Sequence, residues 1–179
     1  MTGKIFLSSN ELTKDSFRLA KKIYDSGWHP EVIVGLWRGG TPVGIAVQEF
    51  LQYKGIKSYH TAVKTMAYTG IGEHGKPIIE NLEPLLRHIR PETKVLVVDD
   101  IFDSGDTCAA MKESLSPHTN QLRFATLYYK PLRSKQNFAP DFYQRETNEW
   151  LVFPHEIMGL TPEEIVCKDS DLAALLGIV

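Results

Sequence analysis

The fold is decided by one stretch, Val95-Leu96-Val97-Val98-Asp99-Asp100-Ile101-Phe102-Asp103-Ser104-Gly105-Asp106-Thr107. Its four leading aliphatic residues predict a buried strand, and a helix is expected over residues 107–115. The turn between them is acidic and contains a glycine. A strand that passes through such a turn into a helix is one unit of an open α/β sheet, in which ligands bind at the carboxyl ends of the strands.

The same plan occurs earlier in the chain. Val32-Ile33-Val34-Gly35-Leu36 predicts a buried strand, Arg38-Gly39-Gly40-Thr41-Pro42 predicts a loop, and the apolar spacing up to Tyr53 predicts a helix. Ser8 and Glu11 resemble a capping box at the start of a first helix. Further strands are expected at 58–66, 124–129 and 150–153, and a helix at 162–176. Two strand-loop-helix units predict an α/β fold with an open, twisted, mainly parallel sheet flanked by helices.

Composition narrows the protein class. The 179 residues favour a single domain spanning 1–179, and the net charge of −2 gives no basic excess for binding a nucleic acid. There is no apolar run near the ~18 residues of a membrane span, and the first residues lack the pattern of a signal peptide. Cys108 and Cys167 have no CxxC spacing. We therefore expect a cytoplasmic protein with two free thiols and no membrane contact.

The decisive stretch also suggests a ligand. Asp99 and Asp100 can accept hydrogen bonds from vicinal sugar hydroxyls or hold a hard cation. The turn from Ser104 to Thr107 lies at a helix start, where backbone N–H groups and the positive end of the helix dipole suit a phosphate. An acidic pair on its own is more often part of a solvated loop, but the whole ordered pattern favours a site for a ribose 5-phosphate.

This pattern resembles the phosphoribosyl pyrophosphate (PRPP) motif of the type I phosphoribosyltransferases, and the resemblance is greatest to the 6-oxopurine branch. Phe102 departs from the aliphatic residue usual at its position. The resemblance implies a small hood built from N- and C-terminal segments. It also implies purine salvage, in which the 5-phosphoribosyl group of PRPP passes to N9 of hypoxanthine, guanine or xanthine and pyrophosphate leaves. Mg²⁺ as cofactor and a homo-oligomer, a dimer or a tetramer, are further implications.

The resemblance also implies residue roles. Asp103 would lie near the purine N7 as the proton acceptor, and Lys130 would donate to the 6-oxo group. Trp150 would stack on the base, with main-chain groups near Leu151 at its far edge. The ribose and 5-phosphate of PRPP would be bound by Asp99, Asp100, Asp103, Ser104, Gly105, Asp106 and Thr107. The pyrophosphate would be held by Trp37, Arg38 and Gly39, with a non-proline cis peptide before Arg38, and the metal by Asp99, Asp100 and Glu156.

Some interpretations remain open at this stage. Taken alone, Lys130 and Glu156 could be surface residues, Trp150 a core residue, and the Arg38-Gly39-Gly40 segment an ordinary turn. The glycine-rich segment 68–76 matches the position of a mobile loop that closes over PRPP in the family. Two rival functions also remain: a phosphoribosyltransferase for another base, such as a pyrimidine, and a PRPP-binding regulator without turnover. The chain lacks the DNA-binding helices or basic surface that such regulators commonly carry.

Overall fold

The computed structural model describes residues 3–68 and 75–179, which divide into two compact units. We call Asn10–Asn148 the sheet unit, and Met1–Ser9 together with Glu149–Val179 the terminal unit. Each is described by itself. Within the described residues, none of the helices has the length and apolar character needed to cross a bilayer.

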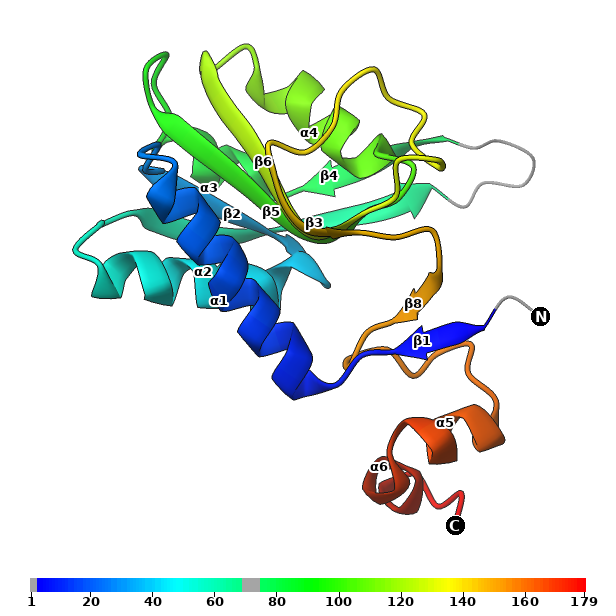
Figure 1. The fold of residues 1–179 in the computed structure, drawn as a ribbon. Coiled ribbons are helices and arrows are strands. Elements are labelled where there is room, and N and C mark those ends of the chain that lie inside the picture. Colours follow the sequence, from blue (N-terminus) through cyan, green and yellow to red (C-terminus); the bar gives the residue numbers. More distant parts are fainter. Residues whose placement is uncertain (1–2, 69–74) are drawn as a thin grey trace. The chain divides into compact units, whose positions relative to one another are not determined.

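The sheet unit is built on six strands in the order β4-β3-β2-β5-β6-β7 (Figure 1). β3 and β4 pair antiparallel, and the other neighbouring pairs are parallel. The strands are β2 (Val32–Trp37), β3 (Tyr59–Tyr68), β4 (Gly75–Glu80), β5 (Lys94–Phe102), β6 (Gln121–Tyr129) and β7 (Phe142–Glu146). This arrangement confirms the predicted open, mainly parallel sheet.

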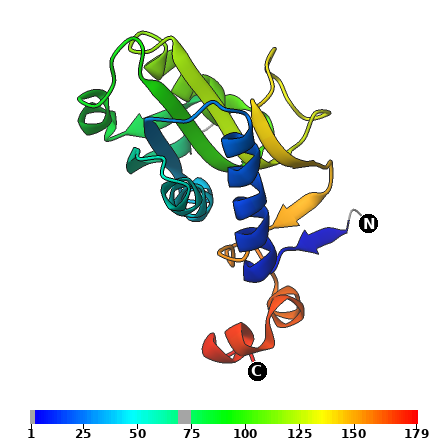
Figure 2. The ribbon, with the colours of Figure 1, turned by 60° about the vertical axis from the view of Figure 1, so that its left-hand side comes forward.

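Helices cover both faces of this sheet. α1 (Ser9–Asp25) and α2 (Gly40–Tyr53) lie on one face and α4 (Asp106–Leu115) on the other (Figures 1 and 2). Val95 and Val97 of β5 belong to the same buried cluster as Met111 of α4 and Leu85 of the short helix α3 (Leu82–Leu86). The next residue, Val98, faces α2 instead. Because β5 is covered on both sides, its sequence is a continuous apolar run rather than an alternating one.

The order in which strands are added to the sheet reverses between β2 and β5. β2, β3 and β4 follow one another toward one edge of the sheet, whereas β5, β6 and β7 follow one another toward the opposite edge. β2 and β5 are direct parallel neighbours, with Val32 opposite Val95 and Gly35 opposite Val98. The segments that follow these two strands therefore meet at a topological switch point, where open α/β sheets bind ligands.

A buried carboxylate on α1 forms an ion pair with the edge strand β7. The Asp15 side chain is 3% exposed and accepts from Arg145 Nε at 3.1 Å and from Arg18 Nη1 at 2.6 Å. Lys22 Nζ of the same helix donates to the Tyr143 carbonyl at 2.8 Å. The charge of Asp15 is thus balanced by two guanidinium groups, as a buried acid requires.

The terminal unit joins the two ends of the chain, as the resemblance implied. β1 (Lys4–Phe6) pairs parallel with β8 (Trp150–Val152), so the strand expected at 150–153 is present but belongs to a separate two-stranded sheet. The single helix expected at 162–176 is wrong: the structure has α5 (Pro162–Lys168) and α6 (Ser170–Leu175). Asp169 separates them because its backbone is extended and its carboxylate accepts from Leu172 N at 3.0 Å, which caps α6.

Candidate functional site

The acidic pair lies within β5 rather than after it. The apolar run predicts a strand that ends at Val98, but β5 continues to Phe102. The reason is its neighbour on one side: β5 pairs with β6 as far as Phe102 opposite Tyr129, whereas its pairing with β2 stops at Val98. Asp99 and Asp100 therefore lie on a stretch of β5 that is not paired with β2.

This stretch of β5 lies against the glycines after β2. A Cβ atom built on Gly39 would lie 1.8 Å from Asp100 Oδ2, and one built on Gly40 would lie 2.2 Å from the Val98 carbonyl oxygen. At Gly40 a Cβ atom would meet backbone atoms, so glycine is required there, whereas at Gly39 it would displace the Asp100 carboxylate. The structure thus brings together two segments, Arg38-Gly39-Gly40 and Asp99-Asp100, that are about sixty residues apart in sequence.

The two acids strongly influence each other. Asp100 N donates to Asp99 Oδ1 at 3.0 Å. Burial, and after it the negative charge of Asp100, raises the pKa of Asp99 well above its ordinary value. A cation or a pair of sugar hydroxyls bound here would relieve this repulsion, which fits the predicted roles of both residues.

The loop after β2 has the backbone form that the resemblance implied. The peptide between Trp37 and Arg38 is cis, as expected. Gly39 is the N-cap of α2 without a side-chain capping bond, and the helix begins at Gly40, earlier than predicted. At this helix start, Thr41 N donates to the Arg38 carbonyl at 3.1 Å, and Gly40 N donates to the Asp99 carboxylate, while the Arg38 side chain is exposed.

The turn after β5, Asp103 to Thr107, has the geometry expected of the predicted phosphate site, and we call it the phosphate turn. Gly105 has φ +79 and is the N-cap of α4, a conformation that a side chain would strain. Ser104 Oγ donates to Asp106 Oδ2 at 2.9 Å and accepts from Asp106 N at 3.3 Å. A cavity of about 190 Å³ is lined by Asp99, Ile101, Phe102, Asp103, Ser104, Gly105, Asp106, Thr107 and Cys108. The predicted phosphate-binding residues therefore share one hollow at the start of a ten-residue helix.

Lys130 lies at the end of β6, beside Asp103. Its side chain is only 4% exposed, and its Nζ donates to Asp103 Oδ2 at 3.2 Å. Its backbone N donates to the Phe102 carbonyl at 2.9 Å, so the strand pairing itself sets the lysine against the phosphate turn. The buried position excludes the alternative of a solvated surface lysine.

A residue that the sequence did not single out completes this cluster. Arg133 Nε lies 2.7 Å from Asp103 Oδ1. Asp103 thus has one cation at each carboxylate oxygen. Nothing in the sequence marks Arg133, because it follows the last predicted strand in a polar segment that fits any surface turn.

Three predicted residues belong to the terminal unit. Trp150 is 55% exposed at the start of β8, and Leu151 is buried opposite Ile5 of β1. Glu156 Oε2 accepts from Phe153 N at 2.9 Å, and the Glu156 carbonyl accepts from Lys168 Nζ. Trp150 is therefore not a core residue. The Glu156 carboxylate is bound to the backbone amide of Phe153, three residues earlier. Their roles toward a base or a metal remain predictions.

The structure offers Mg²⁺ a partial set of ligands. Among residues 3–68 and 75–179, no three His, Cys, Asp or Glu side chains gather into a metal site. Asp99 and Asp100 present adjacent carboxylates, the hard oxygen donors that Mg²⁺ accepts when substrate oxygens and water supply the rest. The pair thus fits a magnesium ion that arrives with a phosphorylated substrate.

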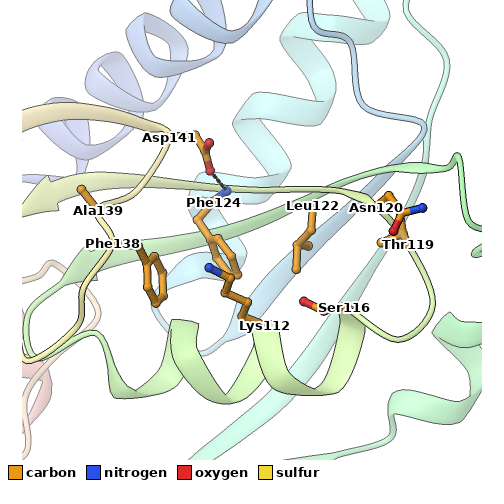
Figure 3. Close-up of a pocket in the computed structure, with 9 residues that line it drawn as sticks. All are labelled: Lys112, Ser116, Thr119, Asn120, Leu122, Phe124, Phe138, Ala139 and Asp141. Atoms are coloured by element: carbon orange, nitrogen blue, oxygen red, sulfur yellow. Dashed lines mark hydrogen bonds between the residues drawn. The ribbon is translucent and has the colours of Figure 1, made fainter.

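A larger hollow lies on the flank of α4 and does not contain the acidic strand (Figure 3). It measures about 350 Å³, and the residues that line it are Lys112, Ser116, Thr119, Asn120, Leu122, Phe124, Phe138, Ala139 and Asp141. Asp141 Oδ2 accepts from Phe124 N at 2.8 Å, which holds the segment before β7 against β6.

The lid predicted at 68–76 lies largely outside the described residues: Tyr68 ends β3, Gly75 begins β4, and 69–74 are not described.

Comparison with protein families gives a match to the phosphoribosyl transferase domain over residues 4–156. The chain belongs to this family. Its fold is that of the type I phosphoribosyltransferases, and the two glycine-containing segments described above lie in the matched region.

Solved structures agree with this assignment. The purine phosphoribosyltransferase of Pyrococcus horikoshii is 25% identical, with a TM-score of 0.70 over 88% of this chain and 97% of that chain. The xanthine-guanine-hypoxanthine phosphoribosyltransferase of Helicobacter pylori is 23% identical, with a TM-score of 0.67 over 98% and 99%. A hypothetical protein of Neisseria gonorrhoeae, solved with bound ppGpp, is 21% identical with a TM-score of 0.75 over 99% and 98%. The last two likenesses concern the fold.

Proposed function

We propose that this phosphoribosyltransferase transfers the 5-phosphoribosyl group of PRPP to N9 of a 6-oxopurine and releases pyrophosphate in purine salvage. The observation that carries the proposal is the pair of Asp103 and Lys130, whose oxygen and nitrogen lie 3.2 Å apart next to the phosphate turn. A 6-oxopurine offers a carbonyl to the ammonium group and a ring proton to the carboxylate. The Pyrococcus horikoshii neighbour is a purine phosphoribosyltransferase, which supports a purine acceptor.

PRPP would bind across the switch point. The phosphate turn binds the 5-phosphate through the amides at the start of α4 and the hydroxyls of Ser104 and Thr107. Asp99 and Asp100 accept hydrogen bonds from the ribose hydroxyls. The loop Trp37 to Gly39 binds the pyrophosphate through its amides and the Arg38 guanidinium.

The reaction then needs one displacement and one proton transfer. The electron pair on N9 forms the new bond to C1 of the ribose, while the bond from C1 to the pyrophosphate oxygen breaks and its electrons leave with pyrophosphate. The proton on N7 passes to Asp103, and the electrons of the N7–H bond return to the purine ring. Asp99, Asp100 and Glu156 would hold Mg²⁺, which would neutralise charge on the departing pyrophosphate.

The remaining parts of the proposal concern the base and the assembly. Trp150 stacks on the purine, with main-chain groups near Leu151 at its far edge, and its exposed indole is available for this contact. We also propose a cytoplasmic homo-oligomer, a dimer or a tetramer, as the active form. Light scattering after size-exclusion chromatography tests the assembly.

Pyrophosphate release tests the function directly. PRPP and Mg²⁺ are mixed in parallel with hypoxanthine, guanine, xanthine, adenine, uracil and orotate. We expect release with one or more of the first three bases. Release with uracil or orotate alone would favour the pyrimidine alternative, and PRPP binding without release for any base would favour the regulator.

The role of Asp103 has its own test. Asp103→Asn keeps the shape of the side chain but cannot accept the proton, so we expect turnover to fall by about 100-fold while the Kd for PRPP changes little. Asp25→Asn, on an exposed acid of α1 paired with Lys21, is the control for loss of one negative charge. Equal losses of turnover and PRPP affinity, or unchanged turnover, would contradict the role.

A further inference from the structure

The two carboxylate oxygens of Asp103 have different partners. Arg133 Nε lies 2.7 Å from Oδ1, and Lys130 Nζ lies 3.2 Å from Oδ2. The contact with arginine is the shorter one. It leaves the oxygen that faces Lys130 as the one that a ligand of the lysine can reach.

The two cations also differ in exposure and chemistry. The Lys130 side chain is 4% exposed, whereas the Arg133 side chain is 52% exposed. A guanidinium keeps its charge and cannot lose a proton in a protein, so it attracts a nearby carboxylate at every working pH. Arg133 can therefore hold Asp103 in one orientation without taking part in proton exchange.

We propose that Arg133 is a positioning residue that fixes Asp103 while the base exchanges with Lys130 at the other oxygen. The inference rests on the proposed function. When the 6-oxo group takes the Lys130 ammonium, Asp103 Oδ2 loses its cation and becomes free to accept the N7 proton. The Arg133 N–H does not donate a hydrogen bond to Oδ1, but the ion pair at 2.7 Å attracts the carboxylate at this oxygen and neutralises the charge that Lys130 no longer balances.

A purely structural role for Arg133 does not fit its surroundings. The turn that carries it is closed by backbone bonds, from Arg133 N and from Ser134 N to the Lys130 carbonyl, both at 3.1 Å. These bonds do not need the guanidinium. Half of the side chain is in solvent, so its removal leaves no cavity in the core.

Kinetics of Arg133→Ala with PRPP, Mg²⁺ and the preferred base test the inference. We expect kcat to fall by about tenfold or more, part of the usual contribution of a well-placed general base, with the KM for PRPP within about twofold of wild type. Arg133→Lys, which keeps a cation, recovers part of the loss. Added guanidinium ion at non-denaturing concentration restores part of the activity of Arg133→Ala. It does not increase the activity of wild type. Arg87→Ala, at an exposed arginine after α3, is the matched control.

The outcomes separate the two proposals. Wild-type protein that releases no pyrophosphate with any 6-oxopurine overturns the proposed function, and this inference with it. Active wild type with an equally active Arg133→Ala overturns the inference alone. The inference is also overturned if the loss of kcat in Arg133→Ala is restored neither in Arg133→Lys nor by added guanidinium, and if PRPP binding is weaker and Tm lower in the same variant. Arg133→Gln, which keeps the Cβ, Cγ and Cδ atoms of the side chain without its charge, replaces the alanine variant if that protein does not fold.

Discussion

Replacing Gly40 with alanine tests how tightly the loop after β2 is packed on β5. The added Cβ would lie 2.2 Å from the Val98 carbonyl oxygen and 2.8 Å from Asp99 Cα. Carbon and oxygen atoms normally come no closer than about 3.3 Å, so the two segments must separate by about 1 Å. Both contacts are with backbone atoms, and no side-chain rotation relieves them.

The expected cost follows from this forced movement. Overpacking of this kind typically destabilises a protein by about 1–3 kcal/mol. For a chain of this size, each kcal/mol lowers Tm by about 2–4 °C, so we expect a decrease of about 2–12 °C. The same 1 Å shift separates the loop after β2 from Asp99 and Asp100, and misplacement of that size can reduce turnover by about 100-fold.

Gly44→Ala is the matched control on the same helix. Its Cβ would meet Gly35 Cα at 3.4 Å and Val98 Cβ at 4.0 Å, which are ordinary contacts. Removing a glycine from a helix interior adds about 0.5–1 kcal/mol of stability, so we expect an unchanged or higher Tm. Thermal unfolding followed by circular dichroism, with calorimetric titration of PRPP, measures both effects. The packing argument would be refuted if the two variants had the same Tm and the same PRPP affinity.

Three further outcomes are expected. Burial and the adjacent acid raise the pKa of Asp99 in the folded protein. The stability that the neutral carboxyl provides is therefore fully present below the pKa of the unfolded chain and is lost as pH rises through the pKa of the folded state. Asp99→Asn should raise Tm without ligand more at about pH 8 than at about pH 5, while PRPP binding weakens. A thiol reagent should modify the exposed Cys167 first, since burial raises the pKa of Cys108; equal rates by mass spectrometry would contradict this. Asp15→Ala should lower the free energy of unfolding by about 1–3 kcal/mol in urea, since it removes the buried partner of Arg145.

Strongly patterned elements of the fold could be predicted from sequence. β2, β5 and β6 are apolar runs, and α1 has regular apolar spacing, so local sequence was sufficient. β1 and β7 were missed because they are short or polar and form through partners far away in the chain. β4 contains Pro77, which is tolerated at the edge of a sheet but weakens the local strand pattern.

The candidate site divides in the same way. Asp99, Asp100 and the phosphate turn lie close together in sequence, so their pattern could be recognised without a structure. The ion pair of Arg133 with Asp103 depends on where β6 ends relative to β5. The close fit of Gly39 against Asp100 likewise depends on strand order, which no local pattern encodes.

The pairing of β1 with β8 gives the first residues of the chain an influence on a remote segment. Lys4, Ile5 and Phe6 lie opposite Trp150, Leu151 and Val152, and Leu7 N donates to the Val152 carbonyl at 3.0 Å. A deletion that removes residues 4–7 would therefore take away the strand partner of the backbone that carries the indole ring. Under the stacking role proposed for Trp150, removal of this strand is expected to change the apparent preference among the 6-oxopurine bases.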